Sequence, residues 1–193
     1  IGAPVYGGRI FKDALERFKV LKGKDTPCIV TVSYGNRHYD DALLELCDFV
    51  KERGFIPFAA AALVGEHTFG NIQIGRPDTE DIATNIKFAN DVIFKNKIEP
   101  IEVPGNRPYK EGGVGAGFRP ETSKTCIKCG LCANNCPMEA ISFEDYKTID
   151  NSKCIACFRC IKSCPVSAKV IKDNNYVEFA KNFTEKLKET REI

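Results

Sequence analysis

Eight cysteines in two regularly spaced runs constrain this 193-residue chain more than any other feature of its sequence. The first run reads Cys-x-x-Cys-x-x-Cys-x-x-x-Cys-Pro, and the second repeats it 28 residues later. The eight positions are Cys126, Cys129, Cys132, Cys136, Cys154, Cys157, Cys160 and Cys164. Two copies of one long spacing do not arise by chance, so we expect all eight thiols to serve one chemistry.

Three chemistries use thiols at this density. Disulfides need an oxidising compartment, and no signal peptide is visible in the sequence. Zinc prefers four tetrahedral ligands, often supplied by two Cys-x-x-Cys pairs. Three cysteines at intervals of three, then a fourth followed by proline, have the spacing of bacterial ferredoxins, whose fourth cysteine ligates the other cluster. We therefore expect two 4Fe–4S clusters, with zinc and disulfides as the alternatives.

The same rule assigns the ligands by crossing the two runs. One cluster is expected to bind Cys126, Cys129, Cys132 and Cys164, and the other Cys136, Cys154, Cys157 and Cys160. Three thiolates on one tight loop cap three irons of a cubane, and the fourth leads into a helix toward the neighbouring cluster. Each oxidised cubane with its thiolates carries a charge of −2, so two clusters would change the formal net charge from +2 to about −2.

The remaining composition is that of a folded chain without a strong electrostatic bias. Hydrophobic residues make up 43%, which is enough for a buried core in one or two domains. Lysine and arginine number 28 against 26 acidic residues, so no field points to nucleic acid or to an anionic membrane. The longest nearly apolar run, 55–64, is far shorter than the ~20 residues needed to span a bilayer. We therefore expect neither nucleic acid nor a membrane as a partner.

The cluster module is expected at residues 121–172. Such a short segment cannot build a large apolar core, so the two clusters are expected to act as its core. Between the cysteine runs, 140–143 and 146–150 alternate as short strands around a turn. Residues 99–120 are rich in glycine and proline, which predicts a linker or an irregular wrapping segment. The last segment, 173–193, is expected to hold a helix that docks through Val177, Ala180, Phe183 and Leu187.

Residues 1–98 alternate between apolar runs and helical stripes, as in a doubly wound α/β sheet. The expected elements are buried parallel strands at 27–33 and 55–64 and helices at 11–21, 43–50 and 78–97. Cys28 and Cys47 fall in a strand and on a helical stripe, away from the cluster spacing. We expect both to be small buried apolar side chains.

Ligands of such sheets bind at the carboxyl ends of the strands, where loops 3–9, 33–39 and 65–69 are expected. The first two loops each present Tyr-Gly next to an arginine. An aromatic ring beside exposed backbone amides suits the stacking and hydrogen bonding of an isoalloxazine. The two histidines, His38 and His67, are expected to be solvated loop residues.

Several motifs make the chain similar to the flavodoxin–ferredoxin fusion family, iron–sulfur flavoproteins of anaerobic microbes. The motifs are Pro4-Val5-Tyr6-Gly7-Gly8-Arg9, Ser33-Tyr34-Gly35-Asn36-Arg37 with Tyr39-Asp40-Asp41-Ala42-Leu43, and Pro104-Gly105-Asn106-Arg107-Pro108-Tyr109. The resemblance covers essentially the whole chain and implies a flavodoxin-like domain followed by a bacterial-type two-cluster ferredoxin domain. It implies FMN bound by Pro4, Val5, Tyr6, Gly7, Tyr34, Gly35, Asn36 and Arg37, with Gly65 and Glu66 close by. It implies no established substrate.

One departure from that family concerns the FMN phosphate. A flavodoxin-like sheet has five parallel strands, and a loop at a helix N-terminus after the first strand cradles the phosphate. No such loop occurs in residues 1–98, and the chain opens inside what resembles the third strand. We therefore expect a partial flavodoxin-like domain at 1–98 that lacks a strand–helix–strand unit, and little FMN bound by this chain.

The expected fold class is thus α/β plus α+β, a partial flavodoxin-like parallel sheet followed by a small dicluster ferredoxin domain. The leading function is electron transfer through two 4Fe–4S clusters, coupled to FMN and to a redox partner protein. Eight thiolates held for iron need a reducing compartment, so we expect the cytoplasm of an anaerobe. The alternative is a flavin- or cluster-linked reductase with its own substrate, and a zinc-stapled module is the third hypothesis. Because no Gly-x-Gly-x-x-Gly motif follows a strand, direct oxidation of NAD(P)H has no support.

Overall fold

The computed structural model describes residues 1–189 and divides into two compact units. One unit holds Ile1–Val114 together with the segment that begins at Leu187, and the other holds Gly115–Lys186. The segment expected as a linker, 99–120, is divided between the units at Val114. Residues 99–114 lie against the first unit, because their backbone N–H groups donate hydrogen bonds to carbonyl oxygens of strand residues such as Pro57 and Tyr6. No helix among residues 1–189 has the length and apolar character to cross a membrane.

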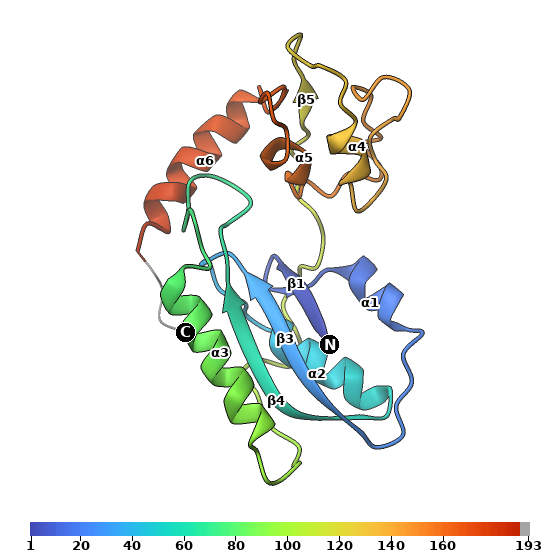
Figure 1. Cartoon of the computed structure of the whole chain (residues 1–193), viewed down its shortest axis with the longest axis vertical. Helices are drawn as coiled ribbons and strands as arrows, with labels where there is room; N and C mark the ends of the chain where they lie inside the picture. The colour runs from blue at the N-terminus through green and yellow to red at the C-terminus, as the bar shows by residue number, and fades with distance from the viewer. Residues whose placement is uncertain (190–193) are drawn as a thin grey trace. The chain divides into compact units, whose positions relative to one another are not determined.

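A four-stranded sheet in the order β2-β1-β3-β4 forms the framework of the first unit. Its parallel strands, side by side in Figure 1, are β1 (Gly2–Tyr6), β3 (Thr26–Tyr34) and β4 (Phe55–Val64). The two-residue strand β2 (Arg9–Ile10) returns antiparallel to β1 across a Gly7-Gly8 turn. Both turn residues have positive φ, 61° and 89°, which glycine adopts without the clash that a Cβ would cause.

The segment expected as a loop at 3–9 is therefore mostly strand. Ala3 lies opposite Val32 and Pro4 opposite Ser33 in the parallel ladder. Only the two glycines form the turn, because the hairpin closes between Tyr6 and Arg9. Such a hairpin is too short to leave a recognisable alternation in the sequence, and it corrects our expectation of an open loop.

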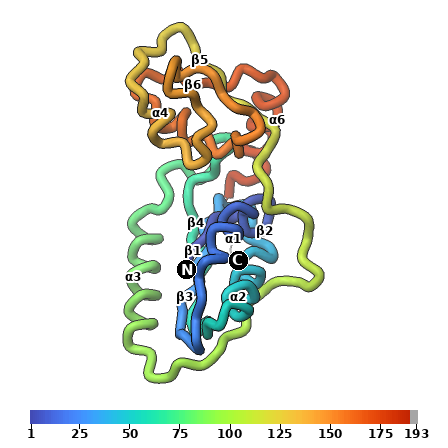
Figure 2. Tube along the Cα trace, turned by 90° about the vertical axis from the view of Figure 1, so that its right-hand side faces the viewer, coloured from blue at the N-terminus to red at the C-terminus, as the bar shows by residue number. Residues whose placement is uncertain are grey.

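Three helices accompany the sheet: α1 (Lys12–Phe18), α2 (Ala42–Glu52) and α3 (Thr79–Ile93). The last begins at a capping box in which Asp78 accepts the backbone N–H of Asp81 and the side chain of Asp81 accepts that of Asp78. Figure 2 shows α2 and α3 on opposite faces of the sheet. The first unit is therefore layered as helix, parallel sheet and helix.

The main core of this unit lies between one face of the sheet and α2. Val30 and Val32 of β3 and Leu46 of α2 are fully buried in it. The other face is covered less well, since Ile29 and Thr31 are only half-buried. Strand 27–33 is thus buried on one face, where we expected burial on both. Three apolar side chains of α3 are exposed: Ile82, Ile86 and Ile93.

The second unit is small and irregular. Its regular elements are β5 (Glu121–Thr122), α4 (Leu131–Asn134), α5 (Arg159–Lys162), β6 (Lys169–Val170) and α6 (Asn174–Lys186). β5 pairs antiparallel with β6. The strands expected at 140–143 and 146–150 reduce to one antiparallel bridge between Ile141 and Ile149.

Aromatic rings attach α6 to its own unit. Tyr176 makes edge-on contacts with Phe118 at 5.0 Å and Phe158 at 5.4 Å between ring centroids, and Phe179 lies 5.3 Å from Phe118. Of the stripe that we expected to dock this helix, Val177 is 57% exposed, while Leu187 is buried just beyond the helix end. Ala180 and Phe183 of the expected stripe are half-buried, so the docking face includes most of that stripe and adds Tyr176, which contacts rings from distant segments.

Candidate metal centres

Each cysteine run forms one loop that enters a single helical turn. In the first run, the loop from Cys126 leads into α4, and in the second the loop from Cys154 leads into α5. The two turns contact each other, which brings the ends of both runs together. This contact is what allows a cysteine from one run to reach the hollow formed by the other.

Two hollows in the second unit are lined by four cysteines each. One, with about 370 Å³ of space including open solvent, is lined by Cys136, Cys154, Cys157 and Cys160. The other, with about 320 Å³, is lined by Cys126, Cys129, Cys132 and Cys164. Each hollow thus takes three cysteines from one run and the last cysteine of the other run. The structure brings together the same two sets of four that the sequence rule predicts as ligand sets.

We call these hollows the first centre, at Cys126, and the second centre, at Cys154. Both offer a donor set of four thiols, which is the set that 4Fe–4S clusters use. No group of three or more His, Cys, Asp or Glu side chains in residues 1–189 converges to hold a single metal ion. The fit to clusters therefore rests on the donor set and on the hollow that the four thiols enclose.

The sequence repeat is also a repeat of backbone conformation. Gly130 and Phe158, 28 residues apart, both precede their helical turn in the left-handed region, with φ of 78° and 54°. Lys128 and Ala156, also 28 residues apart, both have φ of 55°. Non-glycine residues rarely adopt this region, so their recurrence at matched positions shows that both loops have one specific shape.

Backbone amides point at the sulfurs in the same repeated way. The N–H of Ala140 donates to Cys136 Sγ at 3.3 Å, and that of Ala168 donates to Cys164 Sγ at 3.1 Å. These two sulfurs belong to the crossing cysteines, each four residues before the donor. Hydrogen bonds to cluster sulfurs are one of the means by which a protein sets the reduction potential.

Burial controls the thiol pKa values of the second centre. Burial raises the pKa of Cys160 to about 12, although the positive charge of Lys169 opposes the shift. Burial also raises the pKa of Cys157. At the first centre burial raises the pKa of Cys132, whereas at Cys164 backbone hydrogen bonds outweigh the effect of burial and lower the pKa. Because metal ligands must be thiolates, cluster binding has to release protons here.

The two centres differ in their exposure. At the first centre Cys129 is exposed, and three apolar side chains around the hollow are 60%, 42% and 38% exposed: Ile127, Leu131 and Val166. The second centre is lined by buried side chains such as Ile141 and Phe158. The first centre is therefore more open to another molecule than the second.

Two residues near the centres escaped the sequence reasoning. Lys169, which lines the first centre, is only 2% exposed, although lysine is almost never buried unless it is paired. The sequence repeat could have revealed it, because Lys169 occupies the position equivalent to Ile141 in the second copy. Tyr146 lines the same hollow, and its ring lies within contact distance of the place where Gly130 would carry a Cβ.

The residues expected to bind FMN lie at the carboxyl ends of the parallel strands, as the sequence predicted. Pro4, Val5 and Tyr6 end β1, and Gly7 turns the chain. Tyr34 ends β3 opposite Val64, the last residue of β4. Gly65 and Glu66 follow that strand. The end of β3 also meets the loop after β4, since a Cβ on Gly35 would clash with His67.

Several of these side chains are engaged within the chain itself. The Tyr6 ring lies 4.7 Å from Phe11, and the Tyr34 ring lies 5.8 Å from Tyr39. Asn36 is 1% exposed, and its amide donates to the carbonyl oxygen of Leu187 at 3.1 Å. The side chain of Asn36 therefore holds the segment after α6 rather than facing solvent.

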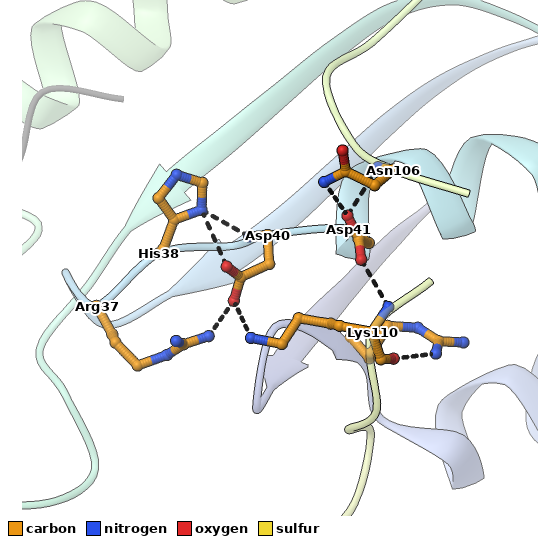
Figure 3. Close-up of polar contacts among 7 residues, drawn as sticks. Arg37, His38, Asp40, Asp41, Asn106 and Lys110 are labelled. Atoms are coloured by element: carbon orange, nitrogen blue, oxygen red, sulfur yellow. Dashed lines mark hydrogen bonds and ion pairs between the residues drawn. The ribbon is translucent and has the colours of Figure 1, made fainter. Parts of the chain in front are cut away.

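Carboxylates tie the loop after β3 to segment 99–114, as Figure 3 shows. Asp40 is paired with Arg37 and accepts from Lys110 Nζ at 3.1 Å. Asp41 is 2% exposed and accepts the backbone N–H groups of Asn106 and Lys110, both at 2.8 Å. Burial by itself would raise the pKa of Asp41, but the hydrogen bonds outweigh it and lower the pKa.

The two histidines lie in loops beside these residues. His38 has 42% of its side chain exposed and accepts the backbone N–H of Asp40 at 2.7 Å. His67 is half-buried and accepts the N–H of Phe69 at 2.9 Å. Both therefore take part in loop structure, and His67 is less solvated than we expected.

Comparison with known protein families identifies the second unit. Residues 125–168, which include all eight cysteines, match the 4Fe-4S dicluster domain family. No curated protein and no solved structure matches the chain. The chain therefore contains a ferredoxin-type 4Fe-4S dicluster domain, beside a mixed α/β unit with a parallel sheet, and a dicluster domain indicates electron transfer.

Proposed function

We propose that this chain is an electron-transfer protein that carries single electrons through two 4Fe–4S clusters. The observation that supports this most directly is the lining of the two hollows, each by three cysteines of one run and one of the other. The first cluster would be held by Cys126, Cys129, Cys132 and Cys164, and the second by Cys136, Cys154, Cys157 and Cys160. When bound, each cluster supplies a one-electron couple of low potential.

The chain itself supplies ligands, hydrogen bonds and exclusion of water. Buried Ile141 and Phe158 shield the second centre. The amides of Ala140 and Ala168 donate to the sulfurs of the crossing cysteines and favour their thiolate form. Low dielectric and directed N–H groups are two of the means of setting the reduction potential that this small unit offers.

The first centre is proposed as the place where a redox partner protein exchanges electrons. It combines the exposed Cys129 with the apolar side chains of Ile127, Leu131 and Val166. A partner that covers this rim would bury apolar surface and bring its own cofactor close to the cluster. The enclosed second centre would then exchange electrons through the first.

We further propose coupling to FMN in a flavodoxin-like first unit. Support comes from the family resemblance and from the parallel strands whose ends carry the Tyr-Gly pairs. A flavin holds one or two electrons, so it could link one-electron clusters to a two-electron partner. We place the protein in the cytoplasm of an anaerobe, because thiols kept for iron need a reducing compartment.

The experiment is anaerobic isolation of the chain, followed by iron and sulfide analysis and a visible spectrum. We expect about eight irons per chain, a broad visible absorption that bleaches on reduction, and uptake of about two electrons. A matched control replaces one ligand of each centre, Cys129→Ser with Cys157→Ser, and should lose this absorption.

Other outcomes separate the alternatives. A colourless protein that contains zinc would contradict electron transfer and favour a structural module. Flavin bands that stay with the protein after unbound FMN has been removed would support the flavin coupling, and their absence would leave a two-cluster carrier. Reduced clusters that are reoxidised by a small substrate, without any partner protein, would favour the reductase.

A further inference from the structure

Lys169 occupies an unusual place in the repeat. The segment Cys136-Pro-x-x-Ala140-Ile141 returns 28 residues later as Cys164-Pro-x-x-Ala168-Lys169. In both copies the last residue is buried, with Ile141 4% exposed and Lys169 2% exposed. The fold therefore places an ammonium group in one half of the module where the other half has an aliphatic side chain.

The lysine is held in place by its strand and by one hydrogen bond. It opens β6, where it lies opposite Thr122 of β5. Its Nζ donates to Thr122 Oγ1 at 2.7 Å. The same residue lines the first centre together with Cys132 and Cys164. In residues 1–189, no carboxylate forms an ion pair with it.

Burying an ammonium group is costly unless a negative charge lies nearby. A hydroxyl oxygen such as that of Thr122 satisfies a hydrogen bond but carries no charge. The proposed cluster of the first centre would carry −2 when oxidised and −3 when reduced, counted with its thiolates. It is the negative group that this position faces.

We propose that Lys169 is the buried counter-ion of the first iron–sulfur centre and makes that centre easier to reduce than it would be beside an aliphatic side chain. The inference rests on the proposed two-cluster function. A fixed positive charge stabilises the more negative, reduced state, and it does so strongly where water is excluded. Because the second copy of the repeat alone carries the charge, the two centres differ in potential although their ligand sets are alike.

The test is a redox titration of anaerobically prepared protein, followed by visible absorption and EPR. In Lys169→Met the reduction equilibrium of the first centre is expected to shift about tenfold toward the oxidised state, which is 59 mV for a one-electron couple. A smaller shift is expected at the second centre. Lys169→Arg keeps the charge and should stay close to the wild-type potential.

The matched control is Lys172→Met in the same module. Its side chain is 61% exposed and pairs with Glu121 at the surface, so removing its charge should leave both potentials unchanged. High salt distinguishes the buried lysine from the exposed one. Because 1 M salt screens surface charges but not buried ones, the potential shift caused by Lys169→Met should persist at that concentration.

Each result decides one question. If all variants contain both clusters and Lys169→Met has the wild-type potentials, the counter-ion role is wrong while the two-cluster function stands. If the wild-type protein contains no iron, the proposed function itself fails. Should Lys169→Met lose the first cluster while Lys169→Arg keeps it, charge rather than shape is responsible and the inference is supported. Equal loss in both variants would overturn it.

Discussion

Crossed ligation is the structural claim that a mutation can test most directly. Cys136 belongs to the first run in the sequence, yet it lines the second centre with Cys154 and Cys160. We therefore expect Cys136→Ala to damage the second centre and to spare the first. An uncrossed arrangement predicts the opposite, because Cys136 would then complete the set that begins at Cys126.

The magnitude follows from losing one of four ligands. Four-ligand structural zinc sites have apparent binding free energies of about 10–16 kcal/mol, so one thiolate contributes about 3 kcal/mol on that scale. This is more than a hundredfold in retention of the cluster. Iron content should therefore fall from about eight to about four per chain after gel filtration.

Double variants turn this expectation into a decision. Cys136→Ala combined with Cys154→Ala removes two ligands of one centre and should still leave about four irons. Cys136→Ala combined with Cys126→Ala removes one ligand from each centre and should leave almost none. EPR of the reduced Cys136→Ala protein should show one isolated cluster without magnetic coupling. If the double variant with Cys126→Ala retained about four irons, the ligands would not be crossed.

Three further expectations concern the rest of the chain. Removing iron should abolish the amide-exchange protection of residues 121–172 before that of residues 9–64 is lost. The reason is that the apolar cluster around Ile141 is small and cannot replace the bound metal. Equal loss of protection in both segments would contradict this expectation. Burial raises the pKa of Cys47 to about 11, so iodoacetamide at pH 8 should label it slowly in the native protein and quickly in denaturant. Burial and the hydrogen bond to Asp48 raise the pKa of Tyr109 to about 12, above the usual value of about 10. The stability that protonated Tyr109 contributes to the fold should therefore be complete below about pH 10 and be lost as the pH rises through about 12. A near-ultraviolet titration should show a lower tyrosine pKa in Asp48→Asn.

The sequence predicted best those features that repeat or that follow a single periodic pattern. The spacing of the cysteines predicted both sets of four that line the hollows. The apolar run 55–64 predicted β4 with its observed bounds. Such features depend on neighbours in the sequence, so they can be recognised without knowledge of the fold.

Features that depend on distant contacts could not be predicted in this way. Asp41 accepts the backbone N–H groups of Asn106 and Lys110, which lie far along the chain. Phe118, in the segment that we expected to be a linker, contacts the Tyr176 ring of α6 and so helps to determine which face of this helix is buried. The burial of Lys169 is seen only in the structure, where β6 pairs with β5.

The matched left-handed residues show how one backbone shape is reached with different side chains. Gly130 and Phe158 hold the same place before their helical turns, but only glycine adopts positive φ without strain. A Cβ on Gly130 would lie 3.4 Å from the Tyr146 ring, an ordinary contact, so Gly130→Ala should cost only the backbone strain of about 1–2 kcal/mol. Phe158→Gly would relieve a similar strain but remove a ring that is 4% exposed and contacts Tyr176, so it should cost a net ~2–4 kcal/mol. The rates at which the two variants lose cluster absorption in denaturant should follow this order, and a Phe158→Gly protein as durable as the wild type would refute the role of the ring.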